Sequence, residues 1–188
     1  MKRTLLSETD TSSSETDTSS PLASLPRGAA RQGSFGLAAL RVTLGILVLA
    51  TWADNLSKDL YTADGLTGLI NWLFSPDGNS SSLSAYQSLL ESVVVPNAGL
   101  FGVLQLIIEF AFGVGLLLGL CTRLCSLLAA GFFVSLFLGY YGGHEWIWTY
   151  VLLTVSAIAV YLGYGGRTLG LDHYLAKARG DSPGSLIW

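Results

Sequence analysis

A run of about twenty-three apolar residues with one charge near its centre sets the strongest limit on how this chain folds. The run is Ala98–Leu120, and the charged residue is Glu109. As a helix rising about 1.5 Å per residue, it would cross the roughly 30 Å hydrocarbon core of a bilayer. A carboxylate in hydrocarbon costs from about 2.5 kcal/mol upward, so Glu109 is expected to face protein or a water-filled cavity. Gln105 lies four residues earlier on the same helical face, which gives this helix a polar stripe.

The composition agrees with a membrane protein. The chain has 188 residues, of which 51% are hydrophobic and only 12% are charged, whereas soluble domains carry about 25% charged residues. Its formal net charge of −3 argues against nucleic acid as a partner. The length suits one compact bundle whose main partner is the lipid bilayer.

Four apolar segments predict an all-α membrane protein, built as a four-transmembrane-helix bundle. The segments are about Phe35–Asp54, Ala98–Leu120, Leu124–Tyr141 and Trp146–Tyr164. The last is followed by Thr168–Arg179, which is expected to lie along the membrane surface as an amphipathic segment. This membrane domain occupies residues 35–178.

The two ends of the chain are polar tails. Residues 1–34 are acidic and rich in Ser and Thr, and they contain SETDTSS twice in tandem, at Ser7–Ser13 and Ser14–Ser20. Such a segment has almost nothing apolar to bury, so it is expected to be disordered. Residues 179–188 form a short C-terminal tail.

The segment between the first and second spans is too polar to cross a bilayer, which predicts an external helical insert. Gly65–Phe74 carries apolar residues at helical spacing, so a short helix is expected to lie flat with Leu66, Leu69, Ile70 and Leu73 inward and Asn71 outward. Leu83–Val94 predicts a second helix, stopped by Pro96. Asn79-Ser80-Ser81 fits a glycosylation sequon, a pattern that is common by chance.

The distribution of basic residues predicts the orientation. On one side of the four spans the only basic residue is Lys58. The other side holds both termini and the basic residues Arg27, Arg31, Arg123, Arg167, Lys177 and Arg179. Basic residues are retained on the cytoplasmic side. We therefore expect a multi-pass protein of the plasma membrane with both termini in the cytoplasm.

Arg41 is the candidate partner for Glu109. Counted from the cytoplasmic side at about 1.5 Å per residue, Arg41 lies near 8 Å deep and Glu109 near 16 Å. Their side chains could span this gap, but Arg41 could also reach phosphate headgroups. The sequence leaves both arrangements open.

Other polar motifs carry less weight. Cys121 and Cys125 straddle the turn after Ala98–Leu120, and they form neither a C-x-x-C redox motif nor a zinc set. A pair of ordinary small residues is the favoured interpretation. His144-Glu145 lacks the second histidine of a zinc-protease motif; a loop histidine is favoured over a proton relay. The sequence shows no metal, haem or flavin motif.

Three segments resemble the DoxX/DoxD family of four-span membrane proteins. Glu109–Arg123 (EFAFGVGLLLGLCTR) is similar to the family's glutamate, glycines and L-L-x-G-L-x-T-R run. Leu40–Gly45 (LRVTLG), followed by Lys58, resembles its R-x-x-x-G and lysine, and Gly165–Asp172 (GGRTLGLD) resembles G-R-x-S-L-D with Gly170 in place of the usual serine. The long insert with Trp72 favours the DoxD branch, the small membrane subunit of thiosulfate:quinone oxidoreductase.

The resemblance implies a subunit of a quinone-linked redox complex that oxidises thiosulfate or a similar sulfur compound. Such a chain would work with a partner subunit or redox protein, and a homo-oligomer is left open. Glu109 and Arg41 are the candidate catalytic residues, and the candidates for binding quinone or a small anion are Gln105, Trp52, Asp54, Lys58 and Tyr140. The alternative is a non-enzymatic scaffold or small-solute carrier. The carrier is less favoured because the spans show no internal repeat and contain no proline.

Overall fold

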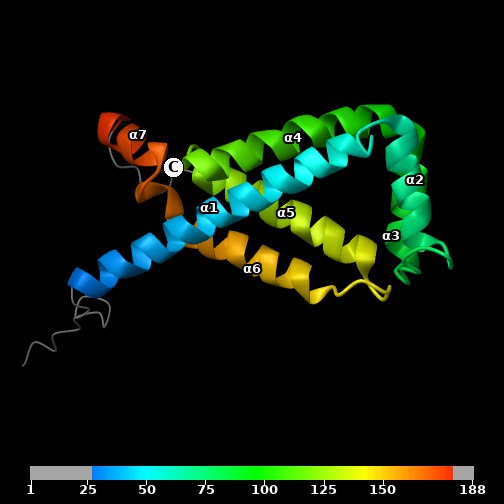
Figure 1. The fold of residues 1–188 in the computed structure, drawn as a ribbon, viewed down its shortest axis with the longest axis horizontal. Helices are drawn as coiled ribbons and strands as arrows, with labels where there is room; N and C mark the ends of the chain where they lie inside the picture. Colours follow the sequence, from blue (N-terminus) through cyan, green and yellow to red (C-terminus); the bar gives the residue numbers. More distant parts are fainter. Residues whose placement is uncertain (1–26, 180–188) are drawn as a thin grey trace, which may run out of the picture.

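The computed structural model describes residues 27–179, and every regular element in that range is a helix (Figure 1). The first helix, α1 (Arg27–Ser57), begins before the expected span, so residues 27–34 are helical rather than part of a disordered tail. The tandem repeat and residues 180–188 lie outside the described residues.

Four helices form a bundle in which each one packs against two neighbours. They are α1, α4 (Ala98–Leu118), α5 (Thr122–Tyr140) and α6 (Trp148–Leu162). Their shared core is apolar and includes Val48, Phe112, Leu116, Ala129, Phe133 and Val160. The absent Cβ of Gly45 allows α1 to approach α4 closely, since a Cβ there would lie 2.6 Å from the backbone nitrogen of Leu117.

The bundle has the outer surface of a membrane protein. Three helical stretches are long and apolar enough to cross a bilayer: Phe35–Ser57, Ser84–Leu118 and Thr122–Tyr140. Helix α6 has 15 residues, about 22 Å of helix, and is therefore shorter than the hydrocarbon core. Large apolar side chains point outward on all four helices, among them Ile46, Leu100, Ile107, Leu127 and Leu152.

Two insert helices cover one end of the bundle. Helix α2 (Ala63–Phe74) and helix α3 (Ser84–Leu89) cross the ends of the longer helices, on the right in Figure 1. Leu66, Ile70 and Leu73 are buried, Leu69 is half-buried against the cavity and Asn71 is exposed, so three of the four residues predicted to face inward are buried. Leu66 and Ile70 pack with Ala98 in a second apolar cluster.

The chain bends at Pro96 instead of stopping there. From α3 it continues through a π-helical turn, Leu90–Val94, and a 3-10 turn, Val95–Asn97, directly into α4. Proline has no N–H for the preceding turn and bends a helix at its position. Asn97 donates a side-chain hydrogen bond of 2.9 Å to the carbonyl of Val93. The prediction that Pro96 ends the helical path is therefore wrong.

Asn79 fastens the insert loop to the loop between α5 and α6. Its side chain is 1% exposed; it donates to Ser81 Oγ at 2.7 Å and accepts from the backbone N–H of Glu145 at 3.2 Å. Its carbonyl accepts from the N–H of His144. A side chain buried in this way has no room for a glycan, so the sequon is a structural loop motif.

Candidate functional site

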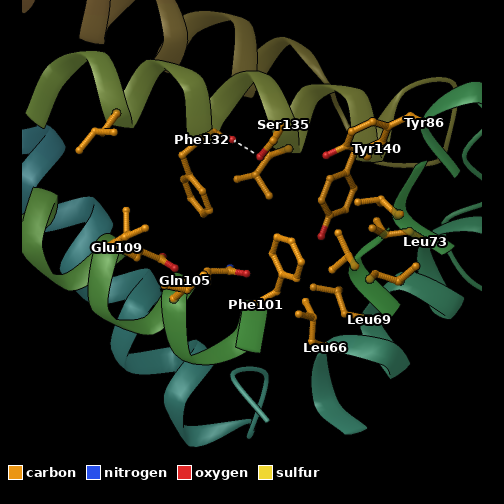
Figure 2. Close-up of a pocket in the computed structure, with 18 of the residues that line it drawn as sticks. Leu66, Leu69, Leu73, Tyr86, Phe101, Gln105, Glu109, Phe132, Ser135 and Tyr140 are labelled. Atoms are coloured by element: carbon orange, nitrogen blue, oxygen red, sulfur yellow. Dashed lines mark hydrogen bonds between the residues drawn. The ribbon is translucent and has the colours of Figure 1, made fainter. Parts of the chain in front are cut away.

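A cavity of about 420 Å³ lies between α4 and α5, beneath the insert helices (Figure 2). Its walls are mainly leucines and phenylalanines, including Phe101 and Phe132. Gln105 and Glu109 contribute polar groups from α4, and Tyr140 contributes its hydroxyl from the other side of the cavity. Pockets for small organic ligands are typically apolar concavities with a few placed polar groups, and this cavity has that character.

Glu109 is held by Tyr61, a residue that no sequence motif indicated. The carboxylate is 1% exposed, and its Oε2 accepts a hydrogen bond of 2.8 Å from the hydroxyl of Tyr61. Its other oxygen, Oε1, is buried and accepts no hydrogen bond of standard geometry, although the side chain of Gln105, one turn earlier on α4, also acts on this carboxylate. A buried acceptor without a partner is costly, so Oε1 marks a place where a ligand donor or a proton would be stabilised.

The turn after α1 carries Tyr61 into the bundle. Its backbone lies directly on α4 at Gly102, where a Cβ would collide with the carbonyl oxygen of Tyr61. Gly102 and Glu109 are seven residues apart, which places them on the same face of α4. Burial, together with the nearby Glu109, raises the pKa of the Tyr61 phenol. Tyr61 therefore keeps its proton and remains a donor to Glu109.

Arg41 lies away from the cavity and forms no ion pair with Glu109. It is 1% exposed, and its Nη2 donates a hydrogen bond of 3.1 Å to the carbonyl of Leu169. A Cβ on Gly119 or Gly170 would collide with its Nη1. The carboxylate whose charge acts on Arg41 is that of Asp172. The acidic residue near Arg41 is therefore Asp172 and not Glu109.

Asp172 joins the C-terminal segment to the turn between α4 and α5. Its two carboxylate oxygens accept backbone hydrogen bonds of 2.8 Å from Cys121 and Thr122, at the N-terminus of α5. Its own N–H donates to the carbonyl of Gly119 at 2.8 Å. A carboxylate at this position satisfies helix donors that have no partner within the helix and complements the helix dipole. We call Arg41, Gly119, Thr122, Gly170 and Asp172 the Asp172 cluster.

The three segments that carry the family resemblance therefore meet in space. Arg41 comes from the first, Gly119 and Thr122 from the second, and Gly170 and Asp172 from the third. Cys121 and Leu169, beside them, have positive φ angles of 49° and 54°. Non-glycine residues persist in this region only where the surroundings fix them. The cluster is a structural joint at the end of the bundle opposite the insert.

The remaining predicted site residues do not form one site. Trp52 belongs to α1, and its indole N–H donates a hydrogen bond of 3.1 Å to the carbonyl of Leu106 on α4. Asp54 and Lys58 form an exposed ion pair of 2.5 Å with each other. Of Trp52, Asp54, Lys58 and Tyr140, only Tyr140 lines the cavity.

The cysteines and His144 have structural surroundings. Cys121 and Cys125 are both free, and burial together with Asp172 raises the pKa of Cys121, which disfavours a reactive thiolate. His144 is exposed on the loop that Asn79 fastens. Within residues 27–179, no group of three or more His, Cys, Asp or Glu side chains could hold a metal ion.

Three polar residues that line the cavity or bind its Glu109, and Asp172 at the opposite end of the bundle, were not predicted from the sequence. Tyr61, Tyr86 and Ser135 stand in segments whose local pattern predicts only helix or turn. Asp172 ends the Gly165–Asp172 segment that resembles the family motif, and an acidic residue at that position was the sequence signal for its role.

Apolar helices with lipid-facing side chains, packed in a bundle around a buried carboxylate, define a multi-pass α-helical membrane protein. Residues 39–188 match the family model described as TQO small subunit DoxD. The chain therefore belongs to the DoxD family, as the sequence motifs predicted. No solved structure matches it.

Proposed function

We propose that this protein is the quinone-binding membrane subunit of a complex that oxidises a sulfur compound, thiosulfate above all, and passes the electrons to quinone. The cavity between α4 and α5 is the observation that carries the proposal. It places a buried carboxylate, Glu109, in an apolar chamber. The family description supports the substrate pair and, through the words small subunit, a partner that supplies electrons.

The residues of the cavity fit a quinone ring. A volume of about 420 Å³ lies within the range of roughly 300–1,000 Å³ that small-molecule sites occupy. The walls are apolar, and the orphan Oε1 of Glu109 offers an acceptor for a proton or a hydrogen bond. The Tyr140 hydroxyl, and the N–H of Gln105 that is not directed at Glu109, offer hydrogen-bond donors toward the carbonyl oxygens of such a ring.

Quinone reduction consumes a proton for each electron, so a proton donor is needed beside the ring. Glu109 is placed to hold that proton, because hydrocarbon surroundings disfavour its charged form. Tyr61 fixes the carboxyl group so that Oε2 is occupied and Oε1 stays available. The insert helices cover this end of the cavity with buried apolar side chains, and water kept out of such a site strengthens each polar contact within it.

The proposal includes an orientation. We infer that α1, α4, α5 and α6 all cross the plasma membrane, with both termini cytoplasmic and the insert external. Support comes from the basic residues at the Asp172 end, among them Arg123 and Arg167, against Lys58 alone at the insert end. Exposed Trp146 and Trp148, at the start of α6, fit the interfacial zone that indole rings prefer.

Purification from native membranes tests the proposed function. The tagged chain is isolated in mild detergent, and thiosulfate-dependent reduction of a quinone is followed by absorbance. We expect a partner to co-purify in fixed proportion and the activity to disappear when this chain is deleted. A homo-oligomer that binds neither partner nor quinone, with thiosulfate-dependent quinone reduction intact in the deletion strain, would instead indicate a scaffold.

A further inference from the structure

Three apolar residues of the cavity wall also face the outside of the bundle. Leu104, Ile108 and Leu128 line the cavity, yet they are 42%, 44% and 43% exposed. The first two belong to α4 and the third to α5, so they stand on the two sides of one gap. Residues that are both cavity wall and outer surface mark an opening, which we call the α4–α5 portal.

The portal exists because α4 and α5 diverge. At the turn that joins them they are in close contact, since a Cβ on Gly115 would collide with the Sγ of Cys125. Toward the insert the two helices separate, and α2 and α3 bridge their far ends (Figure 1). Along this wider stretch Phe112 and Phe132 still meet, with ring centroids 5.7 Å apart. The space beyond them is the cavity.

The insert end of the cavity is covered. Leu66, Ile70 and Leu73 of α2 cover the insert end and are at most 6% exposed. Leu90 and Val94 of the π-helical turn add to this cover. At the depth of Leu104 and Ile108 the outer surface of α4 is continuously apolar, with Val103 and Ile107 beside them. The portal therefore opens toward lipid and not toward water.

The polar groups and the portal lie next to each other on α4. Gln105 follows Leu104 directly, and Glu109 follows Ile108, so each polar residue is about 100° around the helix from a portal residue. A ligand with a polar ring and a long apolar tail matches this arrangement. Its ring would meet Gln105 and Glu109, while its tail would pass between α4 and α5 into the bilayer.

We propose that the α4–α5 portal admits a long-tailed, membrane-dissolved quinone sideways from the bilayer and holds the first part of its isoprenoid tail against Leu104, Ile108 and Leu128. This inference rests on the proposed function and adds the route by which the quinone enters and the preference for a long-tailed quinone.

Binding to the protein in lipid nanodiscs tests the portal without any enzymatic activity. Two ligands are compared: a dimethoxy-methyl-benzoquinone without a tail, and the same ring with a long isoprenoid tail. Affinity is measured from the ligand-dependent rise in the thermal unfolding midpoint and from the quinone retained after gel filtration. The variants are Leu104→Trp with Leu128→Trp, and, as a second blocking variant, Ile108→Trp. The matched control is Leu152→Trp, on a lipid-facing residue of α6 that does not line the cavity.

The blocking variants are expected to weaken binding of the tailed quinone at least about tenfold, or about 1.4 kcal/mol, and to leave the tail-less ring within about twofold. The control is expected to bind both ligands as the wild type does. Equal loss of both ligands, or unchanged binding of the tailed quinone in well-folded blocking variants, would overturn the portal while leaving the cavity as a quinone site. Failure of the wild type to bind either quinone would overturn the proposed function and the portal with it.

Discussion

Tyr61 and Glu109 form a buried hydrogen bond of 2.8 Å across 48 residues of sequence, between the turn after α1 and the middle of α4. Through this bond the insert, the bundle and the cavity depend on one another. Glu109 lies where a ligand can meet it, and Tyr61 holds it in that position. The buried Arg41 lies in the Asp172 cluster, at the opposite end of the bundle from the insert.

Removing the Tyr61 hydroxyl should destabilise the bundle. In Tyr61→Phe the carboxyl group of Glu109 loses its donor, and an unpaired buried polar group costs about 1–3 kcal/mol. Thermal unfolding in detergent measures the effect, with Tyr174→Phe as the control on an exposed tyrosine. Adding Glu109→Leu to Tyr61→Phe should recover part of the loss, because both partners are then apolar. Equal stability of Tyr61→Phe and the wild type would show that the bond contributes nothing.

Removing the carboxylate of Asp172 should destabilise the protein more than removing the Tyr61 hydroxyl does. Asp172→Ala leaves two backbone N–H groups of the α5 terminus without their acceptor and Arg41 buried without a counter-charge. A buried backbone donor without its acceptor costs about 1–3 kcal/mol, so losing both bonds should cost about 2–6 kcal/mol, and the loss of the nearby negative charge adds to this. The free energy of unfolding should recover in part when Arg41→Leu is added, and it should be unaffected by Asp77→Ala in the exposed insert loop. Additive losses from Asp172→Ala and Arg41→Leu would contradict the coupling.

The local patterns of the sequence predicted the elements well. Apolar spacing identified the inward face of α2, because helical periodicity is a property of neighbouring residues. It equally identified the apolar stretches that became α1, α4, α5 and α6. The start of α1 at Arg27 was missed, since polar residues 27–34 offer no apolar face to recognise.

The contacts between distant segments could not be predicted. Arg41 and Glu109 were expected at similar depths because each depth was counted along its own helix from the cytoplasmic side. Their separation in the structure depends on the axial position of α1 relative to α4, which places Arg41 beside Gly119. Gly119 is ten residues from Glu109, or about 15 Å along the chain at helical rise. Tyr61 was missed for the same reason, because a turn carries it down onto Gly102.

Ile70 tests whether the insert is a packed cap. It is 3% exposed and contributes to both the second apolar cluster and the cavity wall. Ile70→Ala is expected to lower the free energy of unfolding by about 2–5 kcal/mol, as other large-to-small core substitutions do. Asn71→Ala, one residue further on the exposed face, should leave it unchanged. If the two variants unfold alike, the insert is a loose appendage.

The orientation can be tested by cysteine labelling in intact cells. In a background without Cys121 and Cys125, a membrane-impermeant maleimide should label Asp77→Cys, in the exposed insert loop. It should label Ser182→Cys only after the membrane is opened, because the positive-inside asymmetry retains that end in the cytoplasm. Labelling of Ser182→Cys in unopened cells would reverse the orientation.

The central claim is that Glu109 supplies a proton to a quinone in the cavity, and turnover of Glu109→Gln tests it most directly. Glutamine keeps the shape and can still accept from Tyr61, so the variant should fold, but it cannot release a proton. Thiosulfate-dependent quinone reduction by the complex with its natural partner should fall about 10²-fold or more, the usual contribution of a general acid. Glu91→Gln, on an exposed glutamate of the insert, should retain full activity. Full turnover of well-folded Glu109→Gln would contradict the account and leave Glu109 a purely structural residue.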